Sequence, residues 1–139
     1  MPKARTEVAV AAWRGRIYVI GGFDGFARTT STVQVYDPTT DTWTMGPPLP
    51  RAVHHAMAAA IGDRLYLVGG FSGVRFAAGD RVFAFDGSTW REVTPLPEPL
   101  GASGIAVLDG RIHVVSGQGR AGNVRSHYVY DPGRDLWAR

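Results

Sequence analysis

One eight-residue pattern occurs three times in this chain, and its spacing is almost constant. Residues 16–23 form an apolar run that ends in a glycine pair and a phenylalanine, and residues 64–71 repeat this pattern 48 positions later. A less regular third copy, residues 111–118, follows 47 positions further on. Three tryptophans keep the same period of 47 residues: Trp43, Trp90 and Trp137. Self-similarity at one spacing between about 20 and 50 residues indicates an array of stacked units. The chain is therefore predicted to contain three units, over residues 1–48, 49–97 and 98–139.

Each unit is predicted to be a four-stranded antiparallel meander, which makes the fold class all-β. In the first unit, a tight turn at Arg14 and Gly15 separates a weakly alternating segment from a continuous β-branched and aromatic run. A later turn contains Pro38, which presets a backbone dihedral, and Asp37, which can accept a hydrogen bond from the residues beyond it. The four strands are expected over residues 7–13, 16–20, 32–36 and 42–45.

The first strand of the second unit tests this register. Residues 56–61 are rich in alanine and, taken alone, have the highest helix propensity in the chain. The repeat aligns them with residues 8–13 and 105–108, which favours a strand. Alanine also suits an innermost strand, because the inner strands of several units converge on one axis where only small side chains fit.

The combined pattern resembles the kelch repeat, in which an apolar run and a glycine pair precede a tyrosine and a tryptophan seven residues apart. Phe85 and Trp90 form a shortened variant of that pair. The resemblance covers essentially the whole chain and implies a β-propeller with one four-stranded blade per repeat. The third repeat departs from the pattern at His113 and Ser116. The residues that carry the motif are Gly21, Gly22, Gly69, Gly70, Gly117, Tyr36, Trp43, Phe85, Trp90, Tyr130 and Trp137.

Three blades do not close a ring, because propellers typically use about four to eight blades. The outer sides of the first and last blades would be left in water. Symmetric copies of a three-bladed chain reach the typical range only as six blades, so we expect a C2 homodimer that closes head to tail. An excised or engineered half of a longer six-bladed chain would look the same and would also have to cover its ends.

The composition argues against several classes of protein. The chain has no cysteine, which removes disulfides, zinc–thiolate sites and thiol chemistry. No apolar run approaches the ~18 residues of a membrane span, and the net charge of +3 comes without a Lys/Arg block, so neither a membrane nor a nucleic acid is an expected partner. No secretory signal is recognisable, so a cytoplasmic location is the default expectation. No metal or cofactor is expected.

The loops between second and third strands and the connections between blades are expected on the same side of the disc, which we call the loop face. Candidate binding residues lie on these segments. Arginine pairs bidentately with carboxylates and phosphates, which favours an acidic peptide or an anionic small molecule as ligand. The alternative is that these are ordinary solvated loop charges. The candidates are Arg28, Arg51, Arg75, Arg120, Arg125, Phe26, Phe76 and His54.

Two histidine features and one glycine motif are interpreted as structural. His54 and His55 are expected to point to opposite sides of a strand, and the matching residues in the other units are taken as 6–7 and 102–103, so no ring of histidines forms. His113 replaces a tyrosine of the other repeats and is expected to be a packing substitute. Residues 117–122 spell a dinucleotide-binding fingerprint, but a strand rather than a helix is expected to follow.

The favoured function is a non-catalytic binding or scaffold module that self-assembles into a six-bladed ring, and no catalytic residue is assigned. The alternative is a kelch-type enzyme, an isomerase or lyase acting on an acidic carbohydrate, that would use Arg28, Arg75, His54 and His55. A purely structural fragment without a ligand is the third interpretation.

Overall fold

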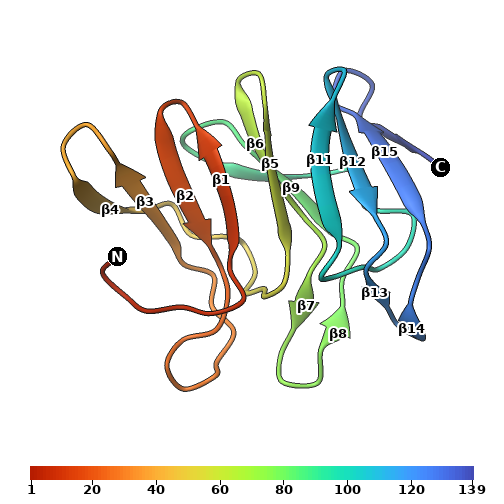
Figure 1. Cartoon of the computed structure of the whole chain (residues 1–139), viewed down its shortest axis with the longest axis horizontal. Helices are drawn as coiled ribbons and strands as arrows, with labels where there is room; N and C mark the ends of the chain where they lie inside the picture. The colour runs from red at the N-terminus through yellow and green to blue at the C-terminus, as the bar shows by residue number, and fades with distance from the viewer.

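Three four-stranded antiparallel sheets follow one another along the chain and stand side by side in space (Figure 1). The computed structural model describes all of residues 1–139. Blade 1 consists of β1 (Ala9–Trp13), β2 (Arg16–Ile20), β3 (Val33–Asp37) and β4 (Thr42–Gly46). Blade 2 consists of β5 (Met57–Ile61), β6 (Arg64–Val68), β9 (Val82–Phe85) and β10 (Trp90–Val93). Blade 3 consists of β11 (Gly104–Leu108), β12 (Arg111–Val115), β15 (His127–Asp131) and β16 (Leu136–Ala138).

Every blade is a simple meander, as the sequence predicts, and the first strands of the three blades are neighbours: β5 lies between β1 and β11. Residues 57–61 are a strand despite their helix propensity, because tertiary pairing with β6 overrides a weak local preference. The observed strand bounds differ from the predicted ones by one or two residues. The structure contains no helix that is long and apolar enough to span a bilayer.

Two of the predicted loops contain short hairpins that the sequence did not reveal. β7 (Phe71–Ser72) pairs with β8 (Ala77–Ala78), and β13 (Gln118–Gly119) pairs with β14 (Gly122–Asn123). The second hairpin spans most of the glycine-rich residues 117–122. This segment leads into strand β15 and not into a helix, as expected, so the strand–turn–helix context that the dinucleotide-binding fingerprint requires is not formed.

The hydrophobic core is divided between two interfaces, each of which we call a seam, between adjacent blades. Trp13 and Tyr18 of blade 1 meet Phe85 of blade 2, with ring centroids 5.8 and 6.2 Å apart. At the second seam, Tyr66 meets Tyr130 edge-on at 5.6 Å. Buried aliphatic side chains of β2, β3, β6, β9 and β12 surround both contacts. The aromatic residues of the repeat therefore form the packing contacts between one blade and the next.

The glycine pair permits a close approach between a blade and the chain segment that leads to the next blade, which we call the connector. Gly22 N–H donates to the carbonyl of Val53 at 2.8 Å, and Gly70 N–H donates to the carbonyl of Leu100 at 2.7 Å. A Cβ on Gly21 would lie nearer than 3.0 Å to the first of these carbonyl oxygens, and a Cβ on Gly69 would lie as near to the second. Each seam thus requires a residue without a side chain at this position.

The tryptophan of each repeat adds a second hydrogen bond across a seam. Trp90 Nε1 donates to the carbonyl of Pro47 at 3.0 Å, and Trp137 Nε1 donates to the carbonyl of Thr94 at the same distance. The Trp43 ring lies against Tyr36 as Trp137 lies against Tyr130, in a tilted arrangement with centroids 5.0 Å apart in both cases. Since no blade precedes blade 1 in the structure, the Nε1 of Trp43 has no such acceptor.

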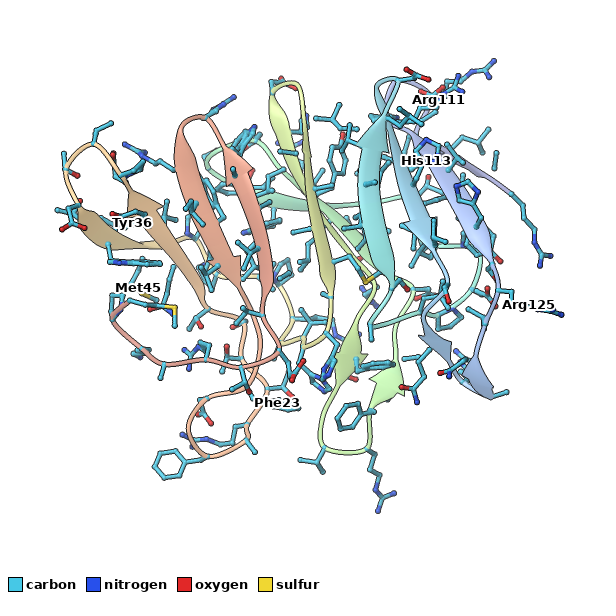
Figure 2. The ribbon with its side chains drawn as sticks, in the orientation of Figure 1. Phe23, Tyr36, Met45, Arg111, His113 and Arg125 are labelled. Carbon is cyan, nitrogen blue, oxygen red and sulfur yellow. The ribbon has the colours of Figure 1, made fainter.

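The outer sides of blades 1 and 3 face no other blade and expose apolar residues. Figure 2 shows Tyr36 and Met45 on the outer side of blade 1 and His113 on blade 3. Six apolar residues in these places are between 37% and 59% exposed to solvent. On blade 1 these residues are Val10, Ile17 and Met45, and on blade 3 they are Leu108, Val115 and Leu136.

Candidate interaction surface

The loop face is built as the meander predicts: the loop after β2 and the hairpins β7–β8 and β13–β14 lie along the same edge of the molecule (Figure 1). All five candidate arginines are exposed on these loops or on the connector before β5. They come from three separate loops and one connector.

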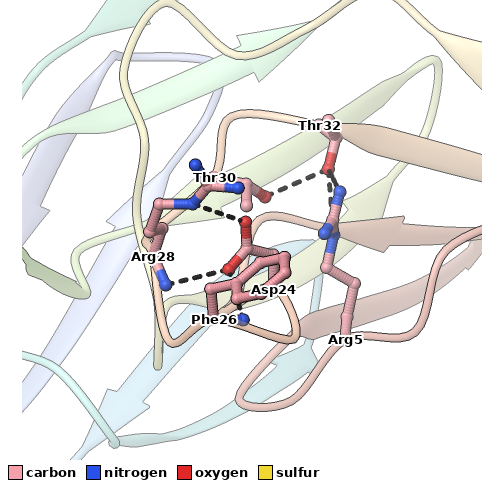
Figure 3. A network of polar contacts seen from close by, with 6 residues as sticks. All are labelled: Arg5, Asp24, Phe26, Arg28, Thr30 and Thr32. Atoms are coloured by element: carbon pink, nitrogen blue, oxygen red, sulfur yellow. Dashed lines mark hydrogen bonds and ion pairs between the residues drawn. The ribbon is translucent and has the colours of Figure 1, made fainter.

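The loop after β2 is held in shape by Asp24. Its carboxylate accepts hydrogen bonds from the backbone N–H groups of Phe26 (2.9 Å) and Arg28 (3.0 Å) and from the Arg28 side chain (3.0 Å). These bonds, the Arg28 N–H above all, lower the pKa of Asp24. Arg28 also lies over the ring of Phe26, which is 82% exposed. An apolar tip and a cation are therefore offered to solvent together (Figure 3).

His54 does not present a free nitrogen to a ligand. Only 1% of its surface is exposed; its Nε2 lies 3.0 Å from the carbonyl of Gly73, and its Nδ1 lies 2.7 Å from Nδ1 of His55. The ring stacks on Phe23 at 4.1 Å and also contacts Phe76. The structure therefore gives His54 a packing role in holding the β7–β8 hairpin against the loop of blade 1.

The expectation that His54 and His55 point to opposite sides is wrong. His55 has a φ of 51°, a left-handed conformation that ends strand alternation and turns its ring toward His54. Glu7 and Ala102 share this conformation at the matching places of the other blades, with φ of 54° and 51°. The residues that correspond to the histidine pair in blade 3 are accordingly 101–102, one position earlier than the sequence alignment placed them.

A chain of hydrogen bonds runs through the histidine pair. The Gly73 carbonyl can only accept, so Nε2 of His54 carries a proton; Nδ1 of a neutral His54 then accepts from Nδ1 of His55. His55 Nε2 lies 3.0 Å from the carboxylate of Glu7. Burial lowers the pKa of His54, and the nearby His55 lowers it further, against the Gly73 carbonyl, which raises it. The surroundings of His54 therefore favour its neutral form.

His113 occupies the place of Tyr18 and Tyr66 in the cross-strand register, as predicted. It faces the open outer side of blade 3, so it packs against no neighbouring blade. Its Nδ1 instead lies 3.0 Å from Nε2 of His127. No group of three or more side chains that could hold a metal ion is present.

Two concavities occupy equivalent places on the loop-face side of blades 1 and 2. In blade 1, residues 3–5 and the loop over 24–32 enclose about 490 Å³. In blade 2, residues 51–53 and the segment over 67–83 enclose about 310 Å³, with Leu67 and Phe83 among the lining residues. The predicted site residues include Arg28 and Arg51 but not Lys3, Arg5 or the threonines of this concavity. The 48-residue period aligns residues 1–5 with 49–53, and this was the signal that could have found Lys3 as the counterpart of Arg51.

Comparison with known proteins agrees with this geometry. Family models described as the kelch motif match residues 4–50 and residues 52–97. The chain belongs to the kelch-repeat family. The third repeat lies outside both matches, yet blade 3 has the same four-stranded order as blades 1 and 2.

Several kelch proteins are similar to this chain over most of its length. Mouse Kelch-like protein 35 is 33% identical over 136 residues, which cover 96% of this chain and 22% of that protein. Human Kelch-like protein 34 is 30% identical over 148 aligned positions, which cover all of this chain and 22% of that protein. Kelch repeat protein M-T8 of Myxoma virus is 33% identical over 81% of this chain. The chain thus spans about a fifth of the length of the relatives it matches.

Proposed function

We propose that this kelch-repeat protein-interaction module binds an acidic partner, peptide or small anion, through its loop face. The observation that carries the proposal is that five exposed arginines occur on that face with exposed apolar tips beside them, Phe26 at 82% and Val74 at 77%. Arginine forks recognise carboxylates, and neighbouring aromatic side chains add apolar contact.

We further infer that a second copy of the chain covers the two open outer sides and completes a six-bladed ring. The outer side of blade 1 is built from the residues that, in blades 2 and 3, face the preceding blade. Tyr36 and Trp43 take the places of Tyr130 and Trp137, which are buried at a seam. A blade packed there would give Trp43 Nε1 the acceptor that Trp90 and Trp137 already have.

The closing seam would differ from the two internal seams. Ser116 takes the place of Gly21 and Gly69 with a similar φ of 60°, and its Cβ stands where a connector carbonyl packs at the internal seams. His113 would meet Tyr36 of the second copy, as Tyr66 meets Tyr130. Closure is therefore expected to be weaker than the internal packing.

Fluorescence anisotropy with a labelled peptide rich in aspartate and glutamate tests the loop-face proposal. The variants Arg75→Gln and Arg120→Gln should each weaken binding about threefold to tenfold, and raising the salt from about 50 to about 200 mM should weaken it further, because exposed charges are screened. Arg111→Gln is the matched control, since Arg111 lies at the opposite edge (Figure 2). Equal effects of all three substitutions, or no binding, would refute the proposal.

A further inference from the structure

The concavity on blade 1 has a charge that the corresponding places on the other blades lack. Its lining includes Lys3, Arg5 and Arg28 but one carboxylate, Asp24. The place of Lys3 is taken by Arg51 in blade 2 and by Glu98 in blade 3. In blade 2, Arg81 is paired with Glu92 at 2.7 Å, and Asp80 in the same lining offsets the charge of Arg51. In blade 3, Glu98 accepts hydrogen bonds from Ser126 and Tyr128. A surplus of positive charge is therefore specific to blade 1.

The two guanidinium groups of this concavity are fixed in place but only partly used. Arg5 donates from Nε (3.2 Å) and Nη2 (2.7 Å) to Oγ1 of Thr32. Arg28 donates from Nε to Asp24 at 3.0 Å. Figure 3 shows the two arginines on opposite sides of Asp24 and Thr30. Nη1 of Arg5 and both terminal nitrogens of Arg28 remain as donors without a protein acceptor.

The threonine hydroxyls supply one further donor between the arginines. Oγ1 of Thr32 accepts both bonds from Arg5, so its own proton is directed to Oγ1 of Thr30, 3.0 Å away. Thr30 therefore acts as acceptor in this contact and keeps its own O–H for another group. Cations and a free hydroxyl donor arranged around a concavity are complementary to an anion with several acceptor oxygens.

We propose that the concavity formed by Lys3, Arg5, Arg28, Thr30 and Thr32 is an oxyanion site that takes a carboxylate or a phosphoryl group. The inference rests on the proposed function, since the site would anchor the acidic partner of the loop face. It stays accessible when a ring closes: the equivalent concavity of blade 2 persists at about 310 Å³ although blade 1 is packed against that blade.

Titration of the whole chain by isothermal calorimetry and by amide NMR tests the site. The probes are inorganic phosphate, a phosphoserine peptide and a glutamate-rich peptide of the same length. If inorganic phosphate and the phosphoserine peptide bind but the glutamate-rich peptide does not, the ligand is a phosphoryl group. If the glutamate-rich peptide binds, the ligand is a carboxylate. Either result supports the site. A small anion is expected to bind with a dissociation constant of roughly 1 mM. If none of the probes binds at about 10 mM, which is well above that constant, the proposed site is wrong.

Substitutions assign the binding to these residues. Arg5→Gln and Arg28→Gln should each weaken binding about tenfold, and Thr30→Val about threefold, because charge-assisted bonds are worth roughly twice neutral ones. Asp24→Asn, which removes the competing carboxylate, should tighten it. Arg111→Gln is the control. Unchanged affinity in the Arg5 and Thr30 variants, with amide shifts elsewhere, overturns the inference.

The outcomes separate this site from the broader function. If Arg75→Gln and Arg120→Gln weaken binding of the acidic peptide while Arg5→Gln and Thr30→Val do not, the loop-face function stands and the oxyanion site fails. If Arg5→Gln and Thr30→Val weaken phosphate binding but no acidic peptide binds, the site stands without the loop-face function.

Discussion

Replacing Gly69 by alanine should destabilise the fold far more than replacing Gly62, although both glycines have nearly the same backbone conformation. Gly69 has a φ of 58° and Gly62 a φ of 56°. A Cβ on Gly62 meets nothing within 4 Å, whereas a Cβ on Gly69 would lie nearer than 3.0 Å to the Leu100 carbonyl oxygen and 3.2 Å from Leu96 Cδ1. The pair therefore separates backbone strain from the close approach at the seam.

The magnitudes follow from these contacts. Gly62→Ala should cost about 1 to 2 kcal/mol, the strain of a left-handed residue. Gly69→Ala adds about 1 to 3 kcal/mol for overpacking and about 1 kcal/mol if the bond from Gly70 N–H to Leu100 lengthens. The total for Gly69→Ala is about 3 to 6 kcal/mol.

Urea unfolding followed by tryptophan fluorescence measures both free energies of unfolding. The signal is suited to the question, because Trp90 and Trp137 each hydrogen-bond across a seam. The two variants should differ by about 2 kcal/mol or more. If they are equally stable, the glycine pair is needed only for its backbone conformation, and the argument about close approach of the connector is wrong.

Three further predictions concern the seams and the histidines. Trp90→Phe removes the 3.0 Å bond to Pro47 and should lower the free energy of unfolding by about 1 kcal/mol; Trp43→Phe, whose nitrogen has no such bond, should cost less in a monomer, and the reverse order would contradict the seam assignment. Ser116→Gly should lower the dimer dissociation constant severalfold in concentration-dependent light scattering, and an unchanged constant would show that this outer side is not a seam. The pKa of His54 is lowered from 6.5 by burial, so the unfolded chain takes up the proton first. Stability should fall as pH drops from about 7 to about 5, and His54→Asn should flatten this dependence in urea titrations at several pH values. An unchanged slope would show that His54 does not control it.

Most of the fold could be predicted from the repeat, and the first strand of blade 2 shows the reason. Residues 56–61 form a strand against their own propensity because the register of the glycine pair and the tryptophan constrains the unit more strongly than local preference does. The same register placed His113 in the position of Tyr18 and Tyr66. Long-period repetition predicts pairing well, since each unit must pack on a copy of itself.

The sequence was less informative where single backbone angles decide the geometry. The contact between His54 and His55 depends on a left-handed residue, and nothing in a histidine pair signals a φ of 51°. The hairpins β7–β8 and β13–β14 are only two residues per strand, too short for alternation to be visible. The candidate oxyanion site joins residues 3–5 to residues 24–32, and no local pattern links these segments.

The mass of the 139-residue chain in solution is the most direct test of the proposal that two copies complete one ring. The chain has a mass of 15.0 kDa, so light scattering should give about 30 kDa for a closed C2 dimer. The outer residues Val10, Met45, Val115 and Leu136 should then lose their exposure. A monodisperse species of 15.0 kDa with these side chains still accessible would contradict the account.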